Sequence, residues 1–151
     1  MPRGRTGRRG RRADPKLERL SQVSLFSGCS NRDLKLIAGS VDEIDVPAGK
    51  VLIRQGDSGS ECFVISDGRA TAKIRGKGTY KLGPGTCFGE MSLLDNEVRS
   101  ATVTADTDMS LFVLSSREFS KLISRVPNVA LRVMASLAKR VREAERAQPQ
   151  H

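Results

Sequence analysis

Phe88-Gly89-Glu90-Met91-Ser92-Leu93-Leu94, followed by Arg99-Ser100-Ala101-Thr102-Val103, is the stretch that decides how this chain folds and what it can hold. Gly89 has no Cβ, so the backbone there can turn sharply and approach a ligand closely. The residues after it favour a short helical turn, whose first N–H groups have no internal partner and attract an anion. Arg99 adds a forked, permanently charged donor that suits phosphate oxygens. The stretch therefore predicts an anion site.

Glu90 narrows the kind of ligand, because a carboxylate repels phosphate. It fits the site if it accepts a hydrogen bond from a sugar hydroxyl beside the phosphate. A phosphate and a free ribose hydroxyl in one small molecule indicate a nucleotide and argue against a site for bare phosphate or sulfate. Taken singly, Glu90 could instead cap a helix, and Arg99 could form a surface ion pair with Asp95 or Glu97.

The segment from Leu82 to Leu94, with Arg99-Ser100-Ala101-Thr102 after it, resembles the phosphate-binding cassette of the cyclic nucleotide-binding domain family. The resemblance extends over roughly residues 22 to 146. It implies that Glu90 bonds the ribose 2′-hydroxyl and that Arg99 neutralises the cyclic phosphate, with backbone groups nearby completing the cradle. The ligand-binding residues that it implies are Phe88, Gly89, Glu90, Met91, Ser92, Arg99, Ser100 and Ala101.

The same resemblance implies the fold class, which is mainly β: a β jelly roll with N-terminal helices and with C-terminal hinge and lid helices. Val98 departs from the family, in which many members have proline at this position, and this change affects the stiffness of the loop. Ser100 stands where members selective for cyclic GMP often have threonine. Because serine still offers a hydroxyl, we expect only weak selectivity between the two nucleotides. We expect the ligand to be cyclic AMP rather than cyclic GMP.

The composition of the chain is consistent with a single domain. The chain has 151 residues, enough for one domain with a sizeable core, and with five Phe, one Tyr and no Trp that core is mostly aliphatic. No apolar run approaches the length of a membrane helix, and no signal segment opens the chain, so we expect no membrane partner. Cys29, Cys62 and Cys87 show no metal-like spacing and are expected to be free thiols in a reducing cytoplasm.

Catalysis is not expected. The sole histidine is His151, at the end of the chain, so no Ser-His-Asp or Cys-His set can be assembled around a central base. No cluster of metal-ligand residues stands out either. The sequence therefore predicts neither an enzyme nor a resident cofactor or metal, but a binding protein.

The net charge of +9 lies mainly at the two ends. Residues 1–14 hold six Arg and one Asp, residues 15–127 hold fifteen basic and fourteen acidic side chains, and residues 128–151 hold five basic and two acidic ones. Residues 1–14 have no apolar anchor and read as a disordered Arg/Gly-rich tail. That tail is either a solvated extension, or the product of a start codon assigned too early, or a nonspecific nucleic-acid contact through residues 1–13.

We therefore divide the chain into the tail 1–14, a domain 15–146 and a frayed end 147–151. Within the domain we expect a helical part at 22–41, the β-roll at 42–114 with the cassette at 88–102, and C-terminal helices at 115–146. Helices are predicted at 15–23 and 30–40 and strands at 44–46, 51–53, 62–65, 70–74, 80–82, 100–105 and 109–114.

The C-terminal part reads as two helices. Ser115 and Glu118 form a capping-box pattern, and Pro127 fits the start of a second helix that runs to about Arg146. Its apolar positions step by four and three, as in a coiled-coil seam, so the helix either pairs two subunits or folds over the roll as a lid. The seam comprises Ala130, Met134, Leu137, Val141 and Ala144, and the candidate lid contacts are Leu137, Arg140, Glu143 and Ala144.

In the family, ligand binding draws a hinge and the last helix toward the cassette. Phe119 and Leu122 are candidate hinge contacts for Leu93 or Leu94, although ordinary core packing would explain them equally well. The predicted function is a stand-alone, non-catalytic cyclic-nucleotide sensor that signals through its last helix to an unknown effector. Two alternatives stay open: a fragment or relative of a transcription regulator of the catabolite activator type, and a ligand-free domain whose Arg-rich tail binds nucleic acid.

Overall fold

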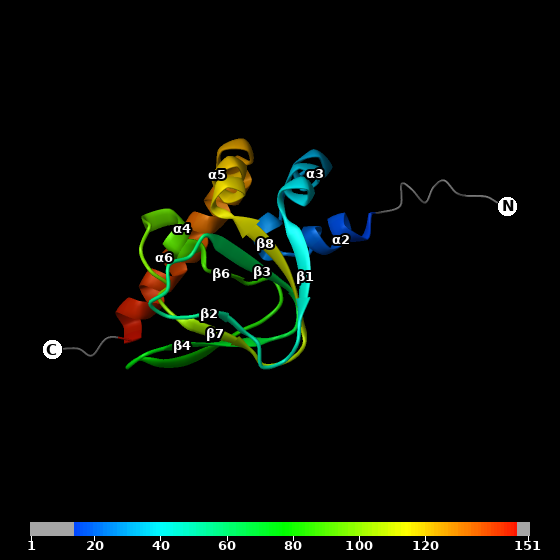
Figure 1. Ribbon diagram of the computed structural model, residues 1–151. Coiled ribbons are helices and arrows are strands. Elements are labelled where there is room, and N and C mark those ends of the chain that lie inside the picture. The colour runs from blue at the N-terminus through cyan, green and yellow to red at the C-terminus, as the bar shows by residue number, and fades with distance from the viewer. Residues whose placement is uncertain (1–13, 148–151) are drawn as a thin grey trace.

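The computed structural model describes residues 14–147 and shows two four-stranded antiparallel sheets with helices gathered at one side (Figure 1). One sheet has the strand order β1-β8-β3-β6 and the other β2-β7-β4-β5. This is the jelly roll expected from the sequence. The strands are β1 (Asp42–Val46), β2 (Val51–Ile53), β3 (Glu61–Asp67), β4 (Ala70–Ile74), β5 (Gly78–Leu82), β6 (Cys87–Phe88), β7 (Thr102–Ala105) and β8 (Met109–Ser115).

Two separate cores explain why β3 and β8 are apolar along almost their whole length. On each of these strands every second residue, such as Val64 or Phe112, faces the helices. The residues between them, such as Ile65 and Leu111, face the second sheet. A strand that is buried on both faces needs apolar residues in succession rather than in alternation. By contrast β4 and β7 alternate buried and partly exposed positions, because only their inner face is covered.

The helices are α2 (Pro15–Ser21), the 3-10 turn η1 (Ser24–Phe26), α3 (Asn31–Ser40), α4 (Glu90–Asp95), α5 (Ser116–Arg125) and α6 (Pro127–Ala147). Ser30 and Asp33 form a reciprocal capping box on α3, and the Ser115 side chain accepts from the Glu118 N–H at the start of α5. Among residues 14–147, no helix combines the length and the apolar composition that crossing a bilayer requires.

Most predicted elements are confirmed within a residue or two at their ends. The structure adds two short elements that the sequence did not predict, η1 and β6, and it ends the first helix at Ser21 instead of Val23. All three cysteines are free, with Cys62 buried and the other two half-buried. The predicted Arg-rich tail lies outside the described residues apart from Asp14, and so does most of the predicted frayed end.

The predicted seam on α6 differs from the structure. Leu137 packs against the helix-side core and Ala130 is half-buried, whereas Met134 and Val141 are exposed. The residues chosen for one seam therefore lie on more than one side of the helix. One line of exposed apolar residues on α6 runs through Leu131, Met134, Ala138 and Val141, and Ala144 of the predicted seam is exposed as well.

Candidate functional site

The candidate site is built where β6 ends and α4 begins. Gly89 caps α4 in the left-handed conformation, with φ 87°, which an L side chain rarely adopts. A Cβ on Gly89 would also lie 2.9 Å from Nη1 of Arg99 and 3.2 Å from the carbonyl oxygen of Glu61. The helix ends at Asn96, which is left-handed as well, and the chain then returns through Arg99 into β7. The turn at Gly89 thus brings the two ends of the cassette together.

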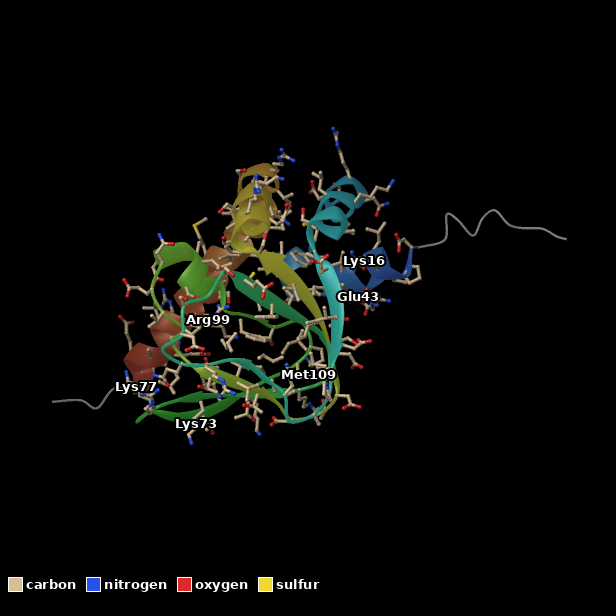
Figure 2. The ribbon with its side chains drawn as sticks, viewed as in Figure 1. Lys16, Glu43, Lys73, Lys77, Arg99 and Met109 are labelled. Carbon is tan, nitrogen blue, oxygen red and sulfur yellow. The ribbon has the colours of Figure 1, made fainter. Side chains whose placement is uncertain are left out.

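Arg99 is buried at the centre of this turn, with 6 % of its surface exposed. Its Nη1 donates to the Gly89 carbonyl and to Ser92 Oγ, both at 2.9 Å, and its Nη2 donates to the Glu61 carbonyl at 2.7 Å. All three acceptors are neutral, so the positive charge has no hydrogen-bonded anion. Figure 2 labels Arg99 beside α4. The surface ion pair with Asp95 or Glu97 is therefore excluded.

The loop between β2 and β3 closes over the other side of Arg99. The Arg99 N–H donates to the Asp57 carbonyl at 2.7 Å, and the Gly56 N–H donates to the Arg99 carbonyl at 3.0 Å. Gly59 lies directly against the guanidinium, and a Cβ there would collide with its Cζ and Nε. Backbone atoms thus contact the guanidinium on two sides, and three of its five N–H groups donate to Gly89, Ser92 and Glu61.

Glu90 is the second buried charge of the site, and α6 supplies its partner. Its Oε2 lies 2.7 Å from Nη1 of Arg140, and the Arg140 Nη2 donates to the Cys87 carbonyl at 3.0 Å. The Glu90 side chain is 3 % exposed, and its other oxygen, Oε1, is buried without a hydrogen-bond partner. A buried carboxylate oxygen that lacks a donor is costly unless a ligand hydroxyl supplies one.

Comparison with known proteins identifies the family of this chain. The family model described as "Cyclic nucleotide-binding domain" matches residues 43–126, more than half of the chain. The chain belongs to the cyclic nucleotide-binding domain family. It is 36% identical over 126 residues to the cyclic AMP receptor protein of Thermus thermophilus, covering 80% of this chain and 58% of that one. It is 34% identical over 105 residues to the cAMP-dependent protein kinase regulatory subunit of Schizosaccharomyces pombe, covering 69% and 26%.

Solved structures support the same family. The Thermus thermophilus catabolite activator protein superposes with a TM-score of 0.73 over 80% of this chain and 59% of that chain. A cyclic nucleotide-binding domain from Methylobacillus flagellatus, 26% identical, superposes with a TM-score of 0.73 over 89% of this chain and 84% of that domain. The chain thus spans more than half of the Thermus protein and about a quarter of the yeast regulatory subunit, so those proteins contain further segments.

In this cyclic nucleotide-binding domain, burial acts on both charges of the site. It raises the pKa of the Glu90 carboxyl above its ordinary value, and the nearby Arg140 partly offsets that rise. Burial also lowers the pKa of the Arg99 guanidinium, which starts so high that the group stays charged. The site therefore presents a fixed positive group and a carboxylate whose charge is costly to keep.

The other predicted site residues divide into contacts and scaffold. Ser92 is 6 % exposed and holds Arg99, whereas Phe88 stacks on Phe63 at 5.1 Å between ring centroids and belongs to the inter-sheet core. Ala101 is buried in that core and Ser100 is exposed. Met91 lies in α4, and the structure describes its backbone only.

Among the predicted lid residues, only Arg140 reaches the site. Leu137 packs on the helix-side core, and Glu143 and Ala144 are exposed. The predicted hinge residues Phe119 and Leu122 lie in that same core, which Leu93 contacts, whereas Leu94 is 46% exposed. Of the two cassette leucines, Leu93 is therefore the one that packs against the core that contains the predicted hinge residues.

Sequence reasoning missed the enclosure of Arg99 by the β2–β3 loop. Gly56-Asp57-Ser58-Gly59 carries a turn signal, but nothing in that signal says that the turn lies against a cassette far along the chain. The Glu61 carbonyl was missed for the same reason, because a backbone acceptor leaves no trace in the sequence.

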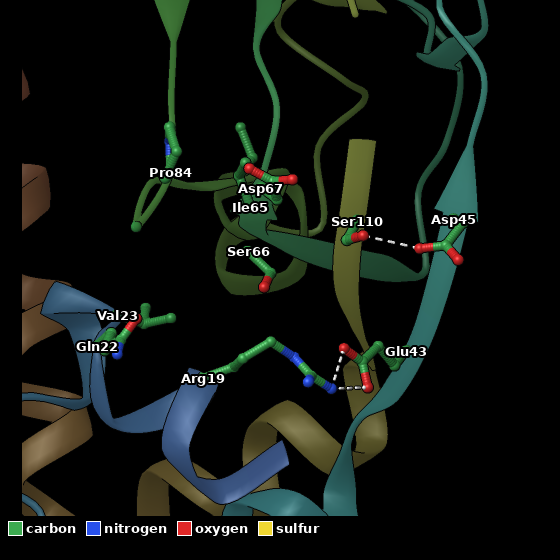
Figure 3. A pocket seen from close by; sticks show the side chains of 11 residues that line it. Arg19, Gln22, Val23, Glu43, Asp45, Ile65, Ser66, Asp67, Pro84 and Ser110 are labelled. Carbon is green, nitrogen blue, oxygen red and sulfur yellow. Dashed lines mark hydrogen bonds and ion pairs between the residues drawn. The ribbon is translucent and has the colours of Figure 1, made fainter. Parts of the chain in front are cut away.

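A cavity of about 740 Å³ lies over the outer face of β1, β8 and β3 (Figure 3). Arg19 of α2 reaches across it to Glu43, and Ser110 donates to Asp45. Glu43, Asp45 and Asp67 make this cavity predominantly acidic, so it does not suit a phosphate.

Proposed function

We propose that this domain binds cyclic AMP between Arg99 and Glu90, and binds cyclic GMP less tightly. The observation that carries the proposal is the pairing of a buried guanidinium that has no hydrogen-bonded anion with a buried carboxylate oxygen that has no donor. A cyclic phosphate would give the Arg99 guanidinium its missing anion, and the ribose 2′-hydroxyl would give the Glu90 carboxylate oxygen its missing donor.

The preference for cyclic AMP rests on Ser100 and on the relatives. Serine replaces the threonine expected for cyclic GMP selectivity, and the protein from Thermus thermophilus that resembles this chain is named a cyclic AMP receptor protein. The serine hydroxyl can still bond a guanine amino group, so the two affinities should differ modestly.

The proposed output is movement of α6. Arg140 holds one oxygen of Glu90, so a ligand hydroxyl at the other oxygen redistributes the carboxylate charge directly under α6. Binding should shift the Arg140 contact and, through Leu93, the packing of α5 against α6. Amide hydrogen exchange across residues 134–146 should slow or quicken on addition of cyclic AMP; an unchanged exchange pattern at saturation would contradict this output.

The solvent-exposed apolar line of α6 favours self-association as an additional feature of this proposal. Leu131 is 61%, Met134 56% and Val141 57% exposed, and together with Ala138 they repeat at steps of three and four. A homodimer through this side of the helix would cover them. Sedimentation of Met134→Glu beside the wild type tests it, and a monomeric wild type would contradict it.

We further propose that the domain acts without catalysis, without a resident cofactor, and in the cytoplasm. Members of the family are sensors and regulatory modules, and the described site offers no base other than Glu90 near the phosphate position. Nucleic-acid contact through residues 1–13 stays a prediction, because those residues lie outside the described part of the chain.

Calorimetric titration of cyclic AMP and cyclic GMP tests the proposal. Wild type should bind both saturably, and Arg99→Ala should weaken binding by at least about 100-fold, since several charged hydrogen bonds are lost. Arg19→Ala is the matched control, because it removes an arginine from the acidic cavity and should leave the affinity unchanged. Absence of binding to the wild type, or equal weakening by both variants, would overturn the proposal.

A further inference from the structure

The helices cover only part of the outer face of the sheet β1-β8-β3-β6. Phe112 of β8 lies in the helix-side core, whereas Ser110, two positions earlier on the same side of the strand, is only half-buried. The cavity of about 740 Å³ opens over this uncovered end of the sheet (Figure 3). The nucleotide site does not use this surface, so it is free to receive something else.

The strand register gathers carboxylates on this face. Asp45 of β1 and Asp67 of β3 both pair with Ser110 of β8, so the two aspartates flank one serine at a separation of about 10 Å. Glu43 lies two residues before Asp45 on β1 and points to the same side. A further cavity, of about 520 Å³, shares Asp45 and Asp67 with the first and adds Asp108. These four carboxylates form the acidic strip.

Most of the acidic strip lacks a charged partner. Glu43 forms an ion pair with Arg19 of α2, which reaches across the cavity (Figure 3). The other three carboxylates form no ion pair within residues 14–147, where Asp45 and Asp108 accept hydrogen bonds from neutral donors. Because like charges repel, a cation that lies along the strip is stabilised there.

The chain itself carries a segment of complementary charge. Residues 1–13 hold six arginines and no acidic residue. Their other residues are Gly, Pro, Thr, Ala and one Met, so charge rather than apolar burial would hold this segment on a surface. Arginine suits such a contact, because its guanidinium can donate several hydrogen bonds to carboxylates. Arg19 provides an example within the described residues, since its Nη2 meets both oxygens of Glu43.

This segment joins the domain beside the acidic strip. Asp14 is the N-cap of α2, and Lys16 of that helix donates to the carbonyl of Val41, just before β1. Arg19, which lines the cavity, is five residues from Asp14, a rise of about 8 Å along the helix. Arg9 precedes Asp14 by five residues, which span up to about 17 Å when extended. Arg9 can therefore reach the cavity.

We propose that residues 1–13 fold back onto their own domain and place arginines along the acidic strip. One exposed ion pair contributes little, but several arginines joined to the domain by a short segment act at a high effective concentration. The docked segment is shielded from polyanions, so the strip competes with nucleic acid for these arginines. The inference is independent of nucleotide binding at the cassette.

Trypsin cleavage tests the docking on the full chain, because the enzyme cuts after exposed arginines. Asp45→Asn/Asp67→Asn should be cut within residues 1–13 at least about threefold faster than wild type, since cleavage follows the population of the undocked segment. The matched control Asp106→Asn/Glu145→Gln removes two carboxylates elsewhere on the domain and should be cut at the wild-type rate. Equal rates for wild type and Asp45→Asn/Asp67→Asn would overturn the proposal.

Amide chemical shifts identify the surface that is covered. Arg→Ser at all six arginines of residues 1–13 should shift the amides of the acidic strip and leave those of Thr71 and Lys81, on the other sheet, unchanged. The difference should not depend on protein concentration, because the contact lies within one chain. Unchanged amides in the strip would overturn the proposal. So would a difference that appears only at high concentration, which indicates a second copy, or protection from trypsin only when a short DNA duplex is added.

Discussion

Two arginine–glutamate pairs join the terminal helices of this domain to its β-roll, and they differ in what they leave unsatisfied. Arg19 of α2 meets both oxygens of Glu43, and the two side chains are 42% and 29% exposed. Arg140 of α6 meets only one oxygen of Glu90, whose side chain is 3 % exposed, and the other oxygen has no partner. The first pair satisfies both carboxylate oxygens and leaves the buried Nε of Arg19 without a partner among the described residues, whereas the second leaves a buried carboxylate oxygen without a donor.

The difference is the reason why we place the proposed site at the cassette rather than at the cavity beside Arg19. The cavity beside Arg19 holds about 740 Å³, yet its charges are already paired or acidic. The cassette contains two buried charges, Arg99 and Glu90, which the proposed nucleotide would contact. Each region leaves one buried polar atom unsatisfied, Nε of Arg19 and Oε1 of Glu90, but only the cassette combines an acceptor that lacks a donor with a guanidinium that has no hydrogen-bonded anion.

The largest expected effect tests the unsatisfied carboxylate. Glu90→Ala should weaken cyclic AMP by about 100-fold, because it removes the ribose acceptor and the anchor of Arg140 together, whereas Glu43→Ala should leave the affinity within about twofold. Calorimetry on both variants measures this. If Glu43→Ala lost as much affinity as Glu90→Ala, the two pairs would not differ in the way described.

A slightly smaller loss is expected from the loop that encloses Arg99. Gly59→Ala should weaken cyclic AMP by about 10- to 100-fold, because its Cβ would displace the guanidinium and its charged hydrogen bonds. Gly39→Ala is the matched control, since a Cβ on this residue of α3 meets nothing within 4 Å. Unchanged binding by Gly59→Ala would mean that Arg99 does not need its present position.

The helix contact itself should contribute less. Arg140→Ala should weaken cyclic AMP by about tenfold or less, since Arg140 contacts Glu90 rather than the phosphate. Arg19→Ala should leave the affinity for cyclic AMP unchanged. It should change the free energy of unfolding by no more than about 1 kcal/mol, as is typical of an exposed pair. Calorimetry and urea unfolding of the two variants check this; tighter binding by Arg140→Ala would instead identify α6 as an inhibitor.

The smallest effect concerns pH. Because the pKa of Glu90 is raised above 4.5 in the folded protein, its contribution to stability is fully present below pH 4.5 and is lost as the pH rises through the folded value. Wild type should therefore gain stability relative to Glu90→Gln between pH 7 and pH 4.5 in urea unfolding. A gap that stayed constant or moved the other way would contradict the burial of an unsatisfied carboxylate.

Asp106 supplies the control of opposite sign. A hydrogen bond from Thr71 lowers the pKa of its carboxyl, so its contribution is present at neutral pH and is lost as the pH falls. The stability of wild type relative to Asp106→Asn should accordingly fall on acidification, opposite to the comparison with Glu90→Gln.

The sequence predicted the pieces of the site that depend on local spacing. The residues of the two quoted stretches, 88–94 and 99–103, carried the family resemblance, and that resemblance predicted both the cassette and the roll. It could not select Arg140 from among the lid candidates, because the rotation of α6 is set by packing against the core of residues far away in the chain, such as Phe26 and Phe112.

The same cause explains the difference in the α6 seam. Apolar residues occur on more than one side of this helix, so steps of three and four fit several lines, and only the packing of Val129, Val133 and Leu137 shows which line is covered. The two-residue strand β6 and the three-residue turn η1 are too short to produce any periodic pattern.

The most direct test of the account compares cyclic AMP with 2′-deoxy cyclic AMP by calorimetry on the wild type and on Glu90→Ala. The account predicts saturable binding of cyclic AMP to the wild type, binding of the deoxy compound that is at least about tenfold weaker, and near-equal affinities of the two compounds for Glu90→Ala. Equal affinities of the two compounds for the wild type, or no binding of either, would contradict it.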